Sequence, residues 1–319
     1  MLKRLKMGYL VLGMITFFGM ITPTIQAAEG AKKKLVLIAG RKSHAYGQHA
    51  FKAGCLLLKD CLDKATPNIE TVVVLDGWPK DSKVFDGASA IVIYSDGGGG
   101  HPFLPHLKEI DALAKKGVGI GMMHYGVEVT KGPGGDAFLD WIGGFFEANW
   151  SVNPTWTLVR SELAKNHPVT NGVGEVRTLD EWYYHMRFRD KMDGVTSILS
   201  SFPPKETLNR PDGPHSGNPF VRESMAKGES QVLAWVRERP DGGRGFGYTG
   251  GHFHWNWGVD SNRKMVLNAL VWLCKEPIPE GGIASARPPL EELKKNQDYD
   301  LPKNFDFESI EKRLTAGNK

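Results

Sequence analysis

Short apolar runs alternate with longer amphipathic segments over the first half of the chain. Four such runs occur, at residues 34–40, 69–75, 90–94 and 118–123. Continuous apolar runs of this length are typical of strands buried on both faces of a parallel sheet. The segments 48–64 and 104–116 between them are predicted helices. The alternation predicts an α/β fold, with a doubly wound, mostly parallel sheet and helices on both faces.

The pattern changes after Asn149, where Trp and Pro residues interrupt shorter runs. Strands are predicted at 156–159, 182–188, 195–199, 231–236 and 245–249, which gives the C-terminal half a β-rich elaboration. The polar, Pro- and Gly-rich segment 203–222 is predicted to be a long loop, and loops of that length are functional or loosely held. The last predicted helix covers 261–273. Residues 280–319, rich in Pro, Lys and Glu, are predicted to be a surface tail.

The N-terminus has the pattern of a secretory signal peptide. Lys3, Arg4 and Lys6 precede an uncharged apolar stretch from Met7 to Ile21, and small residues follow up to Ala27. We therefore predict a signal peptide over 1–27, a single domain over 28–279, and a periplasmic or secreted protein. The alternative is an uncleaved anchor, which would then be the only part in contact with a membrane.

Composition excludes some classes of function. The formal net charge of +4 includes the three basic residues of the leader, so the rest of the chain is nearly neutral. It has no basic cluster with interleaved aromatics, which argues against nucleic-acid binding. Of the three cysteines, Cys55 and Cys61 fall within one predicted helix and Cys274 lies at the end of another; all are expected to be buried free thiols rather than a disulfide framework. The sequence does not predict an oligomeric state.

Histidine and carboxylate side chains follow three of the predicted parallel strands. In order along the chain they are His44, His49, Asp96, His101, His124 and Glu128. Ligands in such sheets gather beyond the carboxyl ends of the strands, so these positions favour a common site. His44 and His49 are five positions apart across a loop and a helix start, so these two need not share it. His124, at a strand-to-helix turn, is a candidate base or metal ligand; the alternative is a histidine bonded to a loop carbonyl. Asp96 and His101 are predicted to bind substrate; the alternative is a flexible glycine loop.

Two later segments add further candidates. The segment 250–257 places His252, His254 and Trp255 behind a glycine pair, and an indole such as Trp255 can stack on a sugar ring. In an extended chain His252 and His254 would share one face. On the predicted strand 182–188, Tyr183 and His185 share a face with Glu181, and both are predicted to bind substrate. Glu181 is a further candidate acid or base; the alternative is a solvated strand face.

Local motifs do not identify a cofactor. The chain has neither HExxH nor CxxC, so a metal site would be assembled from distant residues such as His124, Glu181 and His252. Such ligands suit zinc or a similar divalent ion. The glycines after Asp96 match neither a P-loop nor a dinucleotide turn, so no nucleotide cofactor is expected. No GxSxG motif anchors a Ser/His/Asp triad.

Taken together, these motifs resemble the ThuA-like (trehalose utilisation) family. The matching stretches are 40–49, 94–102, 123–129, 141–156, 180–189, 213–219 and 243–257. The resemblance implies a flavodoxin-like fold similar to class I glutamine amidotransferases. The chain carries His124 where those enzymes have a catalytic cysteine, so amidotransferase chemistry is not expected.

The resemblance also implies a function and a site. The substrate would be a small carbohydrate such as trehalose, another disaccharide or a 3-keto-glycoside, consumed by metal-assisted elimination or hydrolysis. The implied site contains His44, Asp96, His124, Glu181 and His252. Of these, His124, Glu181 and His252 would be catalytic, and His44, His124 and His252 would hold the metal. The alternatives are a non-catalytic carbohydrate-binding protein using the same crevice, and an interaction module that uses the charged tail.

Overall fold

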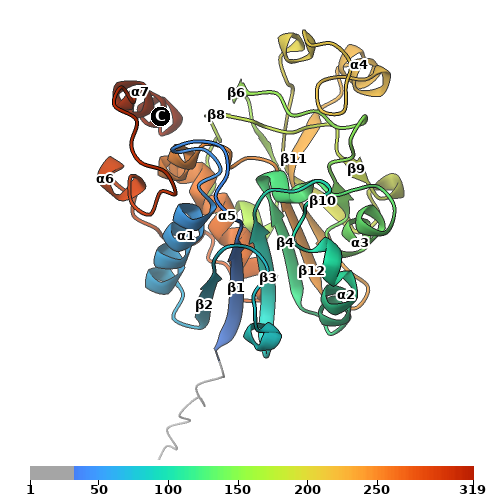
Figure 1. Ribbon diagram of the computed structural model, residues 1–319, viewed down its shortest axis with the longest axis vertical. Helices are drawn as coiled ribbons and strands as arrows, with labels where there is room; N and C mark the ends of the chain where they lie inside the picture. The colour runs from blue at the N-terminus through green and yellow to red at the C-terminus, as the bar shows by residue number, and fades with distance from the viewer. Residues whose placement is uncertain (1–31) are drawn as a thin grey trace, which may run out of the picture. The chain divides into compact units, whose positions relative to one another are not determined.

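An eight-stranded sheet organises residues 32–319, the part of the chain described by this computed structural model. Its strand order is β2-β1-β3-β4-β12-β11-β10-β7 (Figure 1). In that order the strands span Ile69–Val74, Lys33–Ala39, Ala88–Tyr94, Gly119–Met123, Arg244–Tyr248, Gln231–Glu238, Val195–Ser201 and Glu162–Leu163. The first five are parallel and the last three pair antiparallel. The predicted doubly wound sheet is thus confirmed, while the predicted leader over 1–27 lies outside the described residues.

Successive residues of the central strands pack into two different cores. Leu35 and Leu37 of β1 share a core with α1 (Phe51–Ala65) and α5 (Asp260–Leu273). Val36 and Ile38 share the other core with α2 (Leu107–Lys115) and α3 (Pro133–Trp141). Neighbouring strand residues point to opposite faces, so a strand covered by helices on both sides must be apolar at every position. This explains the continuous apolar runs.

The C-terminal half adds two small antiparallel sheets. β5 (Gly144–Phe145) pairs with β9 (Arg187–Phe188), and β6 (Trp156–Leu158) pairs with β8 (Thr178–Asp180). The predicted strand over 182–188 is wrong, because only its last two residues belong to a strand. Tyr183 and Tyr184 are both buried, and His185 has a left-handed φ of 56°, so the expected alternation of faces does not hold.

The segment predicted as one long loop, 203–222, ends in a helix. α4 (Pro219–Ala226) begins with Asn218, whose side chain accepts a hydrogen bond from the backbone N–H of Val221. This is an ordinary helix N-cap, followed by Pro at the first helical position. The loop and α4 project beyond the ends of the strands, on the side where β6 and β8 also lie (Figure 1).

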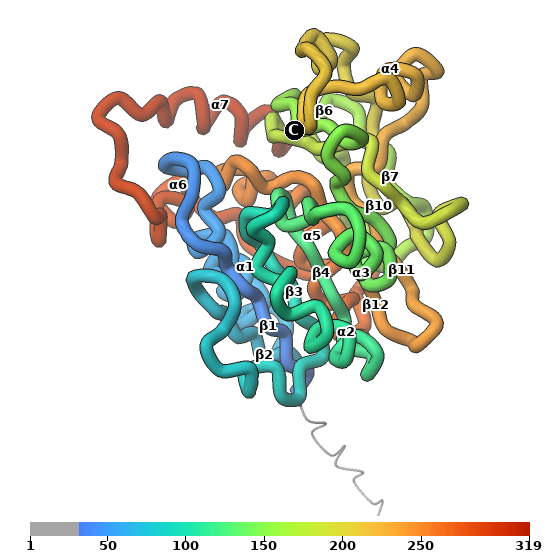
Figure 2. The backbone as a smooth tube through the Cα atoms, turned by 45° about the vertical axis from the view of Figure 1, so that its right-hand side comes forward, coloured from blue at the N-terminus to red at the C-terminus, as the bar shows by residue number. Residues whose placement is uncertain are grey.

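The C-terminal segment folds back onto the domain, as Figure 2 shows in red. It forms α6 (Leu290–Leu293) and α7 (Phe307–Gly317), which bury Leu293 and Ile310. Both helices contact the short 3-10 helix His254–Gly258. Residues 280–319, predicted to be a surface tail, therefore include structured parts. Within residues 32–319, no helix is long and apolar enough to cross a bilayer.

Candidate metal centre

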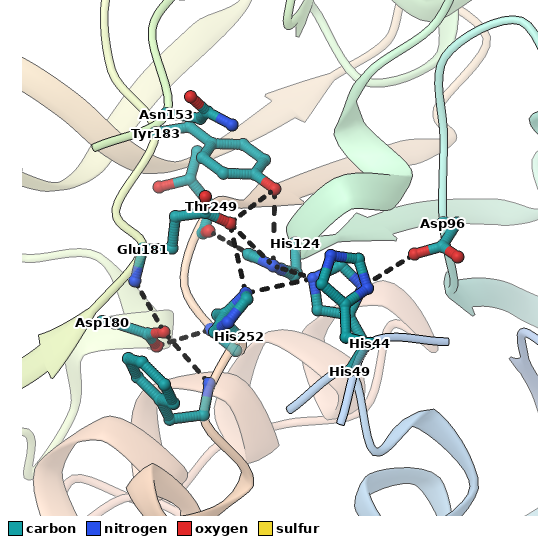
Figure 3. A network of polar contacts seen from close by, with 12 residues as sticks. His44, His49, Asp96, His124, Asn153, Asp180, Glu181, Tyr183, Thr249 and His252 are labelled. Carbon is teal, nitrogen blue, oxygen red and sulfur yellow. Dashed lines mark hydrogen bonds and ion pairs between the residues drawn. The ribbon is translucent and has the colours of Figure 1, made fainter. Parts of the chain in front are cut away.

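Five polar side chains converge at the carboxyl ends of the strands, from segments distant in sequence (Figure 3). They are His49 before α1, Asp96 after β3, His124 after β4, Glu181 after β8 and His252 after β12. The carboxyl ends of the parallel strands meet at one edge of the sheet, so loops distant along the chain become neighbours there. The structure thus brings together the predicted residues Asp96, His124, Glu181 and His252.

Four atoms of this cluster have the spacing of metal ligands. The Nε2 atom of His49 lies 3.1 Å from both His124 Nε2 and His252 Nδ1. Glu181 Oε2 lies 3.2 Å from His252 Nδ1 and 3.7 Å from His124 Nε2, and all four atoms are within 4.8 Å of one another. Ligands about 2.0–2.1 Å from a tetrahedral ion are roughly 3.3 Å apart. The four groups could therefore hold one divalent ion.

The outer nitrogens of two of these imidazoles are already hydrogen-bonded. His49 Nδ1 lies 2.7 Å from Asp96 Oδ1, and His124 Nδ1 lies 3.0 Å from the carbonyl oxygen of Thr249. Both oxygens are acceptors, so each neutral ring carries its proton on Nδ1. Each Nε2 then presents a lone pair to the centre. Metal-binding histidines have the same arrangement, with the outer N–H held by a carboxylate or carbonyl.

Burial keeps these rings neutral. It lowers the pKa of His49 to about 4 and the pKa of His124 well below its usual value. Burial alone would raise the pKa of Asp96, but the hydrogen bonds from His49 and Ser43 and the nearby imidazoles together outweigh it, so the Asp96 pKa lies below its ordinary value. Near neutral pH the cluster therefore combines the neutral imidazoles of His49 and His124 with ionised Asp96, as metal binding requires.

Asp180 holds two members of the cluster in place. Its carboxylate accepts hydrogen bonds from the backbone N–H groups of Glu181, Gly251 and Phe253, at 2.9, 2.6 and 3.2 Å. These amides flank the side chains of Glu181 and His252, so one buried carboxylate fixes both segments. Gly251 has a φ of 108°, which L side chains rarely adopt, and this explains why a glycine precedes His252.

Backbone strain also marks the site. His44, His49 and His124 have φ values of 63°, 43° and 54°. Non-glycine residues in this left-handed region carry a conformational cost and concentrate at functional sites. The surrounding structure holds these three histidines in unfavourable conformations, and in each case the result directs an imidazole towards the cluster.

One side of the cluster is open to solvent. The exposed ring of His44 stacks on His49 with centroids 3.5 Å apart. The Asp96 side chain is 40% exposed and that of Glu181 is 18% exposed. Tyr183 is buried beside the cluster, with its hydroxyl 3.3 Å from Glu181 Oε2 and 3.4 Å from His124 Nε2. His44, predicted to be a metal ligand, belongs to a second potential ligand group with His49 and Asp96.

Three predicted substrate-binding residues have other contacts. His101 is fully buried, with Nε2 3.0 Å from the carbonyl of Gly126. His185 lies 2.8 Å from the carbonyl of Trp150, through Nδ1. Trp255 is 4% exposed and packs against Phe305 of the C-terminal segment. None of the three belongs to the metal-ligand group, and their predicted binding roles remain untested.

One expectation about local geometry is wrong. His254 begins a 3-10 helix and is buried, so it does not share an extended face with His252. In the loop after Asp96, a Cβ on Gly97 would lie 2.1 Å from the carbonyl oxygen of Tyr125, so this glycine allows a close approach to the neighbouring loop.

The cluster has a second acid–imidazole pair beside it, which the sequence did not reveal. His215 Nε2 lies 2.9 and 3.1 Å from the two carboxylate oxygens of Glu128, and its ring stacks on Phe146. The hydrogen bond to Glu128 raises the pKa of His215. Glu128 follows β4 and was a visible candidate, but His215 lies in the irregular loop, where no periodicity points to a partner.

The fold and the cluster define a doubly wound α/β protein with a candidate metal centre at the carboxyl edge of its sheet. A family model described as ThuA, trehalose utilisation, matches residues 36–273, and the chain belongs to this family. No curated protein matches the chain.

Two solved structures are similar in fold. A ThuA-like protein from Parabacteroides merdae is 14% identical, with a TM-score of 0.52, and the match covers 83% of this chain and 99% of that one. A ThuA-like protein from Bacteroides uniformis is 16% identical, also with a TM-score of 0.52, and the match covers 80% and 95% of the two chains. At such identities the likeness shows a shared fold only.

Proposed function

We propose that the chain is a metal-dependent enzyme that cleaves small glycosides by elimination or hydrolysis. The observation that carries this proposal is the convergence of three imidazole nitrogens and one carboxylate oxygen, all within 4.8 Å of one another, on a partly open edge of the sheet. The family's link to trehalose utilisation supports a carbohydrate substrate.

The donor set suits zinc or a similar divalent ion. Three histidines and one carboxylate are common zinc ligands, and each of His49 and His124 has an oxygen partner behind it. A bound divalent ion would supply positive charge beside an oxygen that gains negative charge during the reaction. His124 is fully buried, so this role as a ligand suits it better than direct proton transfer to a substrate.

His44 is the best-placed candidate base. Its ring lies at the open side, Nδ1 is 2.9 Å from the hydroxyl of Ser43, and partial burial lowers its pKa, so the ring is neutral near pH 7. On a 3-keto-glycoside, His44 would take the proton from the carbon beside the ketone. The electron pair of that C–H bond forms a C=C bond while the glycosidic C–O bond breaks. The protonated His44 can then return its proton to the departing oxygen.

Two variants separate the metal centre from the base. Turnover of 3-keto-trehalose by the zinc-loaded protein should be lost in His49→Ala together with the metal. In His44→Gln it should fall about 10²–10⁴-fold while the metal content stays at the wild-type level. The matched control is His167→Gln. His167 is half-buried, directly precedes the 3-10 helix Pro168–Thr170 and lies far from the cluster.

Two results would contradict the enzyme proposal. If the wild-type protein holds the metal and binds the sugar tightly but does not turn it over, the alternative is correct, and the chain is a non-catalytic carbohydrate-binding protein. Turnover unchanged in both His49→Ala and His44→Gln would place the chemistry elsewhere.

We also propose export to the periplasm or beyond, because of the leader pattern in the sequence; cell fractionation with an antibody to the chain tests this directly.

A further inference from the structure

A cavity of about 400 Å³ lies next to the metal-ligand group. Its wall includes Arg41, Asp76, Trp78, Asp96, Gly100 and His106. Asp96 belongs to both places, since its Oδ1 also lies 2.7 Å from His49. Cavities of about 300–1,000 Å³ are the usual size of small-molecule sites, so this space can hold a ligand beside the cluster.

The cavity lies at the topological switch point of the sheet. The chain leaves β1, forms β2 on one side of it and then returns to form β3 on the other side. Arg41 follows β1, Asp76 follows β2 and Asp96 follows β3. Open α/β sheets bind ligands in the crevice where the strand order reverses, outside the carboxyl ends of the strands.

Two charged side chains of this wall, Arg41 and Asp76, have no structural partner among the described residues. Within residues 32–319, neither Arg41 nor Asp76 makes an ion pair or side-chain hydrogen bond with another residue. Asp76 has a φ of 64° and Gly77 a φ of 92°, so the turn after β2 holds an aspartate in an unfavourable conformation. Such strain without a structural partner is typical of functional positions.

Side chains with rings form another part of the wall. The Trp78 and His106 rings stack with centroids 4.0 Å apart and an interplanar angle of 5°, and Pro102 and Pro105 lie beside them. A pyranose ring presents C–H groups on its faces and hydroxyls at its edge, which fits aromatic and proline surfaces next to charged acceptors and donors. Two carboxylates facing one guanidinium disfavour phosphate or another anion.

We propose that this cavity is a second saccharide subsite, so that the substrate has at least two sugar rings. One ring lies over the metal-ligand group, and the other is held by Asp76, Arg41 and the Trp78–His106 stack. Asp96 sits between the two subsites and links them. This inference rests on the proposed carbohydrate function and specifies its substrate class as a disaccharide or longer.

Two variants close or weaken the subsite without touching the metal ligands. A Cβ at Gly100 meets nothing within 4 Å, so Gly100→Leu fits the backbone and fills the cavity. Asp76→Asn removes the charge of an exposed acceptor. The matched controls are Gly281→Leu, whose Cβ also meets nothing within 4 Å, and Glu70→Gln, an exposed carboxylate at the opposite end of β2.

The measurement is calorimetric titration of the zinc-loaded protein with trehalose, 3-keto-trehalose and D-glucose. The wild type and both controls should bind at least one disaccharide more tightly than glucose. Gly100→Leu and Asp76→Asn should bind that disaccharide at least about tenfold more weakly, since hydrogen bonds to charged groups are among the stronger ones. Their metal content should not change.

The outcomes distinguish this inference from the proposed function. If the wild type prefers a disaccharide and Gly100→Leu and Asp76→Asn bind it as tightly as the controls, the subsite is wrong while the carbohydrate function stands. If glucose binds as tightly as both disaccharides, the two-ring substrate is wrong. If none of the three sugars binds to the wild type, the carbohydrate function and this inference are both overturned.

Discussion

The Nε2 atoms of His49 and His124 lie 3.1 Å apart, although neither has a proton to share when both rings are neutral. The Nδ1 proton of His49 faces Asp96, and that of His124 faces the carbonyl of Thr249. Two lone pairs at hydrogen-bond distance repel each other unless a proton or a metal ion lies between them. Burial disfavours the proton by lowering both pKa values, so the arrangement favours a metal ion.

The first prediction is that the protein binds one divalent metal ion and that His49→Ala loses it. His49 is central because its Nε2 lies 3.1 Å from two other ligand atoms. Metal at about 100 times its Kd should stabilise the wild type by about 2.7 kcal/mol, and a chelator should reverse this. Elemental analysis and thermal unfolding with and without zinc measure both effects. Equal metal content in His49→Ala and the His167→Gln control would contradict the prediction.

The second prediction concerns Asp96, which orients His49 without being one of the four ligands. Asp96→Asn keeps the shape and an acceptor oxygen but removes the charge that favours Nδ1 protonation. Such outer partners typically change metal affinity about 10–100-fold, and we expect a loss in this range. Competition with a zinc-binding dye measures it. Asp76→Asn is the control, because that carboxylate lines the neighbouring cavity without contacting a histidine of the cluster; equal losses in the two variants would argue against a specific role for Asp96.

The third prediction concerns Gly250, the glycine directly before Gly251. A Cβ on Gly250 would lie 2.5 Å from both the ring of Trp182 and the hydroxyl of Tyr248. Both side chains are fully buried, so Gly250→Ala should cost roughly 1–3 kcal/mol of the free energy of unfolding. It should also weaken metal binding, since the displaced segment carries His252. Urea unfolding measures the first effect, and Gly281→Ala should be nearly neutral in comparison. A fully stable Gly250→Ala would mean that Trp182 can move.

The fold could be predicted because the sequence pattern that indicates it, short apolar runs, is local. The central strands are buried on both faces, which requires an apolar residue at nearly every position, and that requirement is visible in any short run. The rule that ligands gather at the carboxyl ends of such strands then selected Asp96 and His124 from the sequence alone. Glu181 and His252 were selected from dense polar segments, and the structure places both beside His124.

The remaining site residues depend on turns that the sequence pattern does not encode. His44 and His49 are five positions apart, and only the left-handed φ values of both stack their rings together. His101 follows the same strand as Asp96, but its loop turns the ring inward to the carbonyl of Gly126. The pairing of His215 with Glu128 joins residues 87 positions apart through a loop without periodicity.

The last prediction is a pH dependence of the loop 203–218, which His215 anchors to Glu128. The carbonyl of His215 also accepts from the backbone N–H of Asn153, and that bond does not titrate. The hydrogen bond to Glu128 raises the pKa of His215 above its unfolded value of about 6.5. The stabilisation from this pair is therefore fully present below about pH 6.5 and is lost as the pH rises through the folded pKa.

Limited proteolysis of the loop tests this dependence. Because the His215 side chain is 39% exposed, solvent screening keeps the effect below about 1 kcal/mol. The cleavage rate of the wild type, divided by that of His215→Asn at the same pH, should be lowest in acid and approach one at high pH. The ratio removes the pH dependence of the protease itself. The same ratio, measured with and without His215→Asn in a Glu128→Gln background, should not depend on pH, since the charge that raises the His215 pKa is gone. A ratio that falls as the pH rises would show that neutral His215, not its protonated form, holds the loop.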